Sequence, residues 1–78
     1  MSQRSKLLEK MRNTPANIRF AQVSALLRHE GFVVFNKRGS HRTYHHEDGR
    51  LITLVVPHGK RKTCHPEDIR KLLEVLGS

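Results

Sequence analysis

The chain has 78 residues, which is enough for one domain with one small hydrophobic core. Fifteen lysines and arginines stand against seven aspartates and glutamates, and a formal net charge of +8 on so short a chain favours a polyanionic partner, most often nucleic acid. The single cysteine excludes an intrachain disulfide and a C-x-x-C metal site, while the lack of a signal-peptide core or a membrane-length apolar run predicts a soluble cytoplasmic protein.

The N-terminal part of the chain predicts two helices with a break between them. Residues 1–13 carry a narrow apolar stripe flanked by cations, and Ser5 is a candidate cap for this helix. Pro15 interrupts the pattern, because proline disfavours a helical conformation in the residue before it. A second helix is predicted over residues 20–30, where apolar side chains recur three and four positions apart, and Gly31 is suited to end it.

Three short strands are predicted next, over residues 32–36, 41–46 and 51–56. The turn at residues 47–50 contains Asp-Gly, which is a strong hairpin signal. The third strand is almost wholly apolar, so we expect both of its faces to be largely covered.

The last predicted helix begins at Pro66, which suits the first helical position, and ends at Gly77. Two acidic residues follow the proline and complement the positive end of the helix dipole. The order is therefore helix, three antiparallel strands, helix, and the simplest packing lays both helices on one face of the sheet.

A short segment between the first two strands concentrates groups suited to phosphate chemistry. It contains Lys37, Arg38, Gly39, Ser40 and His41, and Arg42 follows at once. Histidine is the usual general base near neutral pH, so His41 is a candidate to take the proton of a ribose 2′-hydroxyl that then attacks the adjacent phosphorus. The nearby cations would stabilise charge on the phosphate, and the amides of Gly39 and Ser40 could donate to its oxygens. The alternative is an ordinary surface histidine in a basic hairpin.

Neither a second catalytic group nor a metal site is evident among the other histidines. His45 shares a strand face with His41, but four residues span roughly 13 Å, which is too far to serve one phosphate or one metal ion. His46 should point to the opposite face, and Cys64-His65 lacks the spaced partners of a zinc site. We therefore expect no cofactor, no metal, and a slow enzyme with a single histidine.

Further basic residues are candidates for contacts with an RNA backbone. The densest run is Lys60-Arg61-Lys62, and each phosphate contact would steepen the salt dependence of binding. A solvated charged loop is an equally simple interpretation of this run. Tyr44 could stack on a base, although half-buried packing is the commoner role of a tyrosine in a sheet.

An ordered set of residues between Arg19 and Gly77 goes beyond these general signals. It comprises Leu26-Leu27, Gly31-Phe32, Lys37-Arg38-Gly39-Ser40-His41, Tyr44, His46, Asp48-Gly49-Arg50 and Ile69-Arg70-Lys71-Leu72-Leu73. This set resembles the HicA toxins of bacterial toxin–antitoxin modules. Gly-Ser-His after a Gly-Phe strand start is its most specific part.

The resemblance implies an α+β fold like that of a double-stranded RNA-binding domain, with a three-stranded antiparallel sheet and helices on one face. Residues 19–78 would form this domain, and residues 1–18 would be an additional N-terminal helical extension. The resemblance also implies an mRNA-cleaving toxin whose catalytic residue is His41 and whose partner is an antitoxin of the HicB family. RNA is then the expected nucleic acid, with no membrane and no DNA bound by the toxin alone.

Two other functions remain open from the residues themselves. One is a non-catalytic basic RNA- or DNA-binding module, although a winged-helix DNA reader is disfavoured because the last helix offers only Arg70 and Lys71 at its start. The other is an interaction protein whose basic face docks an acidic partner. Both alternatives make His41 dispensable, whereas the toxin hypothesis does not.

Overall fold

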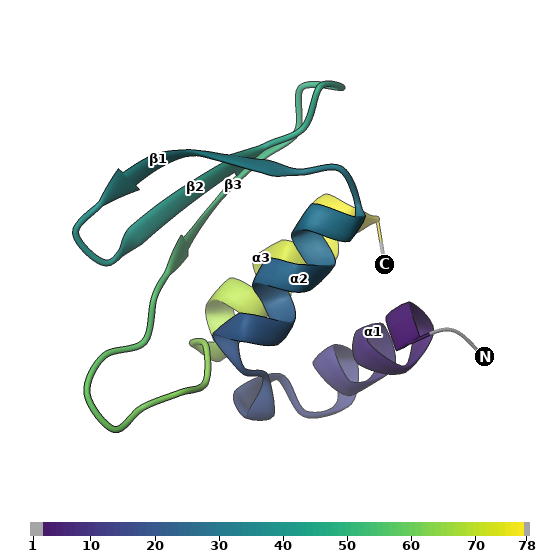
Figure 1. Cartoon of the computed structure of the whole chain (residues 1–78). Helices are drawn as coiled ribbons and strands as arrows, with labels where there is room; N and C mark the ends of the chain where they lie inside the picture. Colours follow the sequence, from purple (N-terminus) through teal and green to yellow (C-terminus); the bar gives the residue numbers. More distant parts are fainter. Residues whose placement is uncertain (1–2, 78) are drawn as a thin grey trace.

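The computed structural model describes residues 3–77, and Figure 1 shows its arrangement. Its elements in chain order are α1 (Gln3–Asn13), a short 3₁₀ turn (Pro15–Asn17), α2 (Phe20–His29), β1 (Val33–Arg38), β2 (His41–His45), β3 (Leu51–Val55) and α3 (Pro66–Leu76). The fold is α+β, with α2 and α3 on the same face of the sheet and α1 farther from it (Figure 1). This arrangement confirms the predicted double-stranded RNA-binding-domain-like fold with an extra N-terminal helix.

The sheet is antiparallel, with β2 in the centre and β1 and β3 at its edges. Tyr44, Ile52 and Leu54 are buried on the face that α2 and α3 cover. The side chains between them point to the opposite face, because successive residues of a strand alternate. That opposite face, which we call the open face, has no described helix over it (Figure 1).

The expectation that both faces of the third strand are covered is wrong. Leu51 is 55% exposed on the open face, whereas Ile52 and Leu54 are buried. Both helices lie on one side of the sheet, so the apolar run in β3 is divided between a core face and a solvent face. Tyr44 is 4% exposed and belongs to the core, which rules out stacking on a base at the surface.

The end of α2 follows the predicted glycine stop. Gly31 has a φ of +92°, its N–H donates to the carbonyl of Arg28, and the N–H of Phe32 donates to the carbonyl of Leu27. These two bonds form a Schellman motif, which ends the helix and turns the chain into β1. A side chain at position 31 would also meet the ring of His46, since an added Cβ would lie 3.0 Å from Nε2.

The N-terminal helix packs into the same core as the rest of the molecule. Leu8 and Met11 of α1 are buried within the core cluster. At the start of α1, Arg4 makes a two-pronged ion pair with Glu30, in which Nε donates to Oε2 at 2.9 Å and Nη2 to Oε1 at 2.8 Å. Ser5 lies within α1, so its predicted role as the cap is wrong.

The start of α3 is tied to the end of β3. Pro66 occupies the first turn as predicted, and the buried carboxylate of Asp68 accepts a hydrogen bond from the N–H of Val55 at 3.1 Å. Gly77 ends the helix with a φ of +75°. No helix within residues 3–77 is long and apolar enough to cross a membrane.

Candidate active site

A tight turn between β1 and β2 presents His41. Arg38 pairs with His41 in the ladder, so Gly39 and Ser40 form a two-residue hairpin loop. Gly39 has a φ of +57° and Ser40 does not have a positive φ, which matches the type II′ turn that favours glycine at its first position. The turn therefore places the exposed His41 side chain at the first position of the central strand, on the open face.

A β-bulge in β1 decides which cation shares the face of His41. The register shifts between Val34 and Asn36, so Phe35 has no direct partner in β2. Beyond the bulge, Arg38 pairs with His41. Because a one-residue slip moves side chains to the other face, an unbulged strand would have placed the preceding lysine opposite His41.

The two cations of β1 consequently differ in position. Lys37 pairs with Arg42 on the face toward the helices, and Arg38 pairs with His41 on the open face. Directly opposite residues have Cβ atoms about 5 Å apart, so the Arg38 guanidinium can reach a phosphate that contacts the His41 ring. The sequence identified both cations but could not rank them, because the bulge leaves no clear local signal.

Arg42 supports the turn. Its Nη1 donates to the carbonyl of Gly39 at 2.9 Å and, at the longer distance of 3.4 Å, to that of His41. Ser40 is also held, since its carbonyl accepts a hydrogen bond from the N–H of Val56 at 2.6 Å. These bonds fix the backbone on both sides of His41, so Arg42 serves the geometry of the turn more directly than it serves an open-face ligand.

The basic loop after β3 begins near the site. Val55 pairs with His41, and Figure 1 shows the loop at the same end of the molecule as the β1–β2 turn. Lys60 and Lys62 have exposed side chains, whereas the Nε of Arg61 donates to the carbonyl of Thr63 at 3.2 Å. Within residues 3–77, the hydrogen bond from Val56 to Ser40 joins the start of this loop to the turn, but no hydrogen bond or ion pair joins Lys60, Arg61 or Lys62 to it.

His46 and Arg50, whose side chains could take part in catalysis or binding, have structural roles instead. His46 packs its ring against Phe32, with centroids 5.1 Å apart, and its Nδ1 accepts a hydrogen bond from the N–H of Asp48. Arg50 lies over the same phenylalanine ring and donates to Asp48 at 2.8 Å and to the carbonyl of Val75 at 3.1 Å. This cluster ties the β2–β3 turn to the end of α3.

The cysteine is not placed for chemistry. Cys64 is buried, and burial raises the pKa of its thiol to about 11. The thiol is therefore protonated near neutral pH, and protonated thiols are poor nucleophiles and poor metal ligands. Across residues 3–77, no group of three or more His, Cys, Asp or Glu side chains could hold a metal ion.

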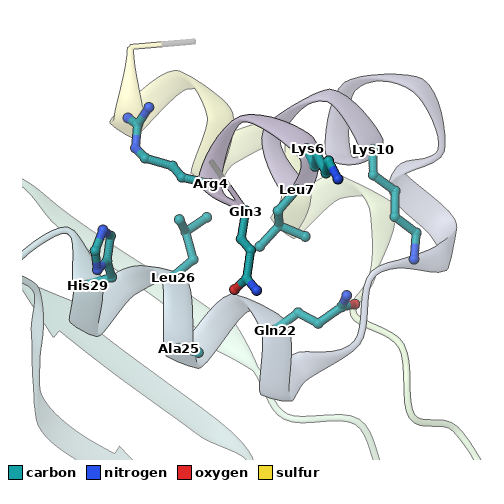
Figure 2. A pocket seen from close by; sticks show the side chains of 9 residues that line it. All are labelled: Gln3, Arg4, Lys6, Leu7, Lys10, Gln22, Ala25, Leu26 and His29. Atoms are coloured by element: carbon teal, nitrogen blue, oxygen red, sulfur yellow. The ribbon is translucent and has the colours of Figure 1, made fainter. Parts of the chain in front are cut away.

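A pocket of about 790 Å³ lies away from His41, between α1 and α2. Figure 2 shows Leu7 and Leu26 directed into this groove, with Lys6 and Lys10 along the α1 side. His29 stands at the other end of the same groove (Figure 2). The groove shares no lining residue with the β1–β2 turn, so it is a separate surface feature.

Comparison with protein-family models matches residues 20–77 to the family described as the HicA toxin of bacterial toxin–antitoxin. No curated protein and no solved structure matches the chain. The matched range contains α2, the whole sheet, the β1–β2 turn with His41, and α3. The chain therefore belongs to the HicA toxin family, and it is the toxin of a toxin–antitoxin system.

Proposed function

We propose that this toxin is a metal-independent endoribonuclease that cleaves mRNA with His41 as its general base, and that a HicB-type antitoxin neutralises it. The observation that carries the proposal is the position of His41. It is an exposed histidine at the first position of the central strand, paired with Arg38 and next to a two-residue turn that contains Gly39. The family to which the chain belongs supports the same reaction.

The chemistry requires one proton acceptor beside the scissile phosphate. His41 accepts the proton of the 2′-hydroxyl, and the resulting oxygen attacks the adjacent phosphorus. The bond from phosphorus to the 5′-oxygen then breaks, which leaves a 2′,3′-cyclic phosphate on one fragment. The departing 5′-oxygen takes up a proton from water or from the protonated His41, so no oxidant, metal or cofactor enters the balance.

Charge that develops on the phosphate is stabilised by groups around the same turn. Arg38 lies opposite His41 on the open face, and Lys37 adds positive potential from the other side of the strand. The backbone amides of Gly39 and Ser40 are additional candidate donors. Lys60, Arg61 and Lys62 would hold the flanking backbone of the RNA.

A single-histidine mechanism follows from the spacing of the strand. His45 lies on the open face but four residues from His41, and that separation is roughly 13 Å along a strand. His45 is therefore too far along the strand to act on the same phosphate as His41. We expect a slow enzyme, which is sufficient for a toxin because few cuts are needed to inactivate messages.

The alternative function is a non-catalytic basic RNA-binding module. It has the same charge, the same open face and the same basic loop, so binding to RNA does not separate the two functions. The two functions differ in that only the ribonuclease requires the imidazole of His41.

Inducible expression in a bacterium, with and without the antitoxin, tests the proposal. The parent chain and a His29→Ala control should arrest growth, and co-expression of the antitoxin should restore it. His29 is a suitable control because it is an exposed histidine on α2, outside the proposed site. His41→Ala should accumulate as a folded protein without arresting growth, and arrest by that folded variant would overturn the catalytic assignment.

A further inference from the structure

The open face of the sheet is organised in three rows that run across its strands. The row nearest the turn contains Arg38, His41 and Val55. The middle row contains Asn36, Thr43 and Thr53, and the hydroxyl oxygens of the two threonines lie 3.1 Å apart. The farthest row contains Val33, His45 and Leu51. The face thus passes from a cationic end, through a polar row, to an apolar end.

An aromatic pair stands at the apolar end. The Phe35 ring contacts the His45 ring edge-on, with centroids 4.8 Å apart and planes at 80°. Phe35 is 56% exposed, although a large aromatic side chain is normally buried in a domain of this size. Its neighbours Val33 and Leu51 are 54% and 55% exposed. The bulge at Phe35 is the local feature that distinguishes this part of β1 from a regular edge strand.

The position of the Phe35–His45 pair relative to His41 indicates which ligand would contact the pair. The other face of the sheet is occupied by α2 and α3, whereas the open face is available to an RNA whose phosphate contacts His41. An RNA strand that continues along β2 from His41 passes the polar row and then meets Phe35 and His45. Sequence-tolerant binding of single strands combines cations for the phosphates with exposed aromatic rings for the bases.

We propose that the Phe35–His45 pair is a stacking platform for a base of single-stranded RNA that lies just outside the two nucleotides joined by the bond cut at His41. This inference rests on the proposed ribonuclease function and specifies its substrate as an unpaired segment of RNA. A base can stack on the free face of the Phe35 ring, and His45 supports the ring from its edge. The platform fixes the register of the strand on the sheet, so Phe35 is a positioning residue and not a catalytic one.

Direct binding tests the platform. The probe is a fluorescein-labelled, mixed-sequence oligoribonucleotide of about eight nucleotides, a length within the usual range of single-strand sites. Binding is measured by anisotropy in the His41→Ala background, so that cutting does not shorten the probe. Phe35→Leu removes the ring but keeps an apolar side chain, Phe35→Trp restores a ring, and Leu51→Ala is a matched control for exposed apolar area.

Phe35→Leu is expected to weaken binding on the order of tenfold, because base–aromatic stacking contributes about that much per base. Phe35→Trp should restore binding, and Leu51→Ala should change it less than about twofold. Circular dichroism verifies that each variant is folded. Equal binding by Phe35→Leu and its parent would overturn the proposal, and so would equal losses for Phe35→Leu and Leu51→Ala.

Cleavage by the variants with His41 intact separates the platform from the chemistry. With a dinucleotide that spans only the cut bond, the KM of Phe35→Leu should equal that of the parent. With the oligoribonucleotide of about eight nucleotides, the KM of Phe35→Leu should be about tenfold higher. If the parent cuts and Phe35→Leu cuts each substrate as well as the parent does, the platform is wrong and the ribonuclease function stands. If the parent does not cut yet the ring-dependent binding is seen, the platform stands and the ribonuclease function falls. A Phe35→Leu variant that loses antitoxin binding but keeps RNA binding would assign the patch to the protein partner and overturn the proposal.

Discussion

At the scale of single residues, the central finding is which side chain faces His41. The sequence places two cations, Lys37 and Arg38, just before the turn, and either could serve the phosphate. The bulge at Phe35 sets Arg38 opposite His41 and sends Lys37 to the other face. One inserted residue in an edge strand therefore selects the cation that accompanies the proposed base.

Substituting these two cations separately tests their difference in position. Arg38→Ala should lower kcat for RNA cleavage on the order of tenfold, because it removes a charge beside the reacting phosphate. Lys37→Ala should leave kcat nearly unchanged and reduce the salt dependence of binding by about 0.7 in the logarithmic slope, as expected for one lost phosphate contact. Steady-state kinetics at several salt concentrations measures kcat and the salt dependence of binding. A larger loss of kcat for Lys37→Ala than for Arg38→Ala would contradict the claim that the bulge selects which cation acts beside His41.

At the scale of secondary-structure elements, the ends of the helices were the most predictable features. Gly31 and Gly77 end their helices with positive φ angles, and Pro66 opens α3, because each residue type restricts the backbone locally. The sidedness of β3 was not predictable. An apolar run such as residues 51–56 shows that a strand is hydrophobic, but only the tertiary arrangement decides whether one face or both are covered.

The link between α1 and α2 is also a tertiary feature. The hydrogen bonds from Arg4 lower the pKa of Glu30, burial of the carboxylate opposes them, and the nearby charges of Arg4, His29 and Arg50 lower the pKa further. A carboxylate with a lowered pKa stabilises the fold when it is ionised. Its contribution is complete above the unfolded-state pKa, at about 4.3, and is lost as the pH falls through the lower folded-state value.

Arg4→Gln should therefore reduce stability at about pH 7, and this reduction should shrink as the pH falls below about 4. The effect should be modest, since the pair is partly exposed and salt screens it. Urea unfolding followed by circular dichroism at several pH values measures the difference. Arg12→Gln is the matched control, because Arg12 is an exposed cation on the same helix. A loss of stability for Arg4→Gln that is the same at every pH would contradict the ion pair as its source.

At the scale of the whole molecule, the fold class and the place of His41 at the start of the second strand were both accessible from the sequence. The order of elements predicted the architecture, the charge of +8 indicated a polyanionic partner, and the Gly-Ser-His segment was the most specific part of the family resemblance. The arrangement of the open face was not accessible, because Phe35 reads as a core residue of a strand. Its exposure follows from the lack of a described layer on that side of the sheet, whereas Tyr44, which the sequence offered as a possible stacking residue but more commonly a packing one, is buried in the core.

The most direct test of the account is cleavage of a mixed-sequence RNA by purified protein in EDTA, with the parent, His41→Ala and His29→Ala measured in parallel. We expect the parent and His29→Ala to cut at equal rates. We expect folded His41→Ala to cut at least about 100-fold more slowly, which is the smallest contribution expected of a general base. Cutting by His41→Ala at the parent rate, or cutting by the parent only after a divalent metal is restored, would contradict it.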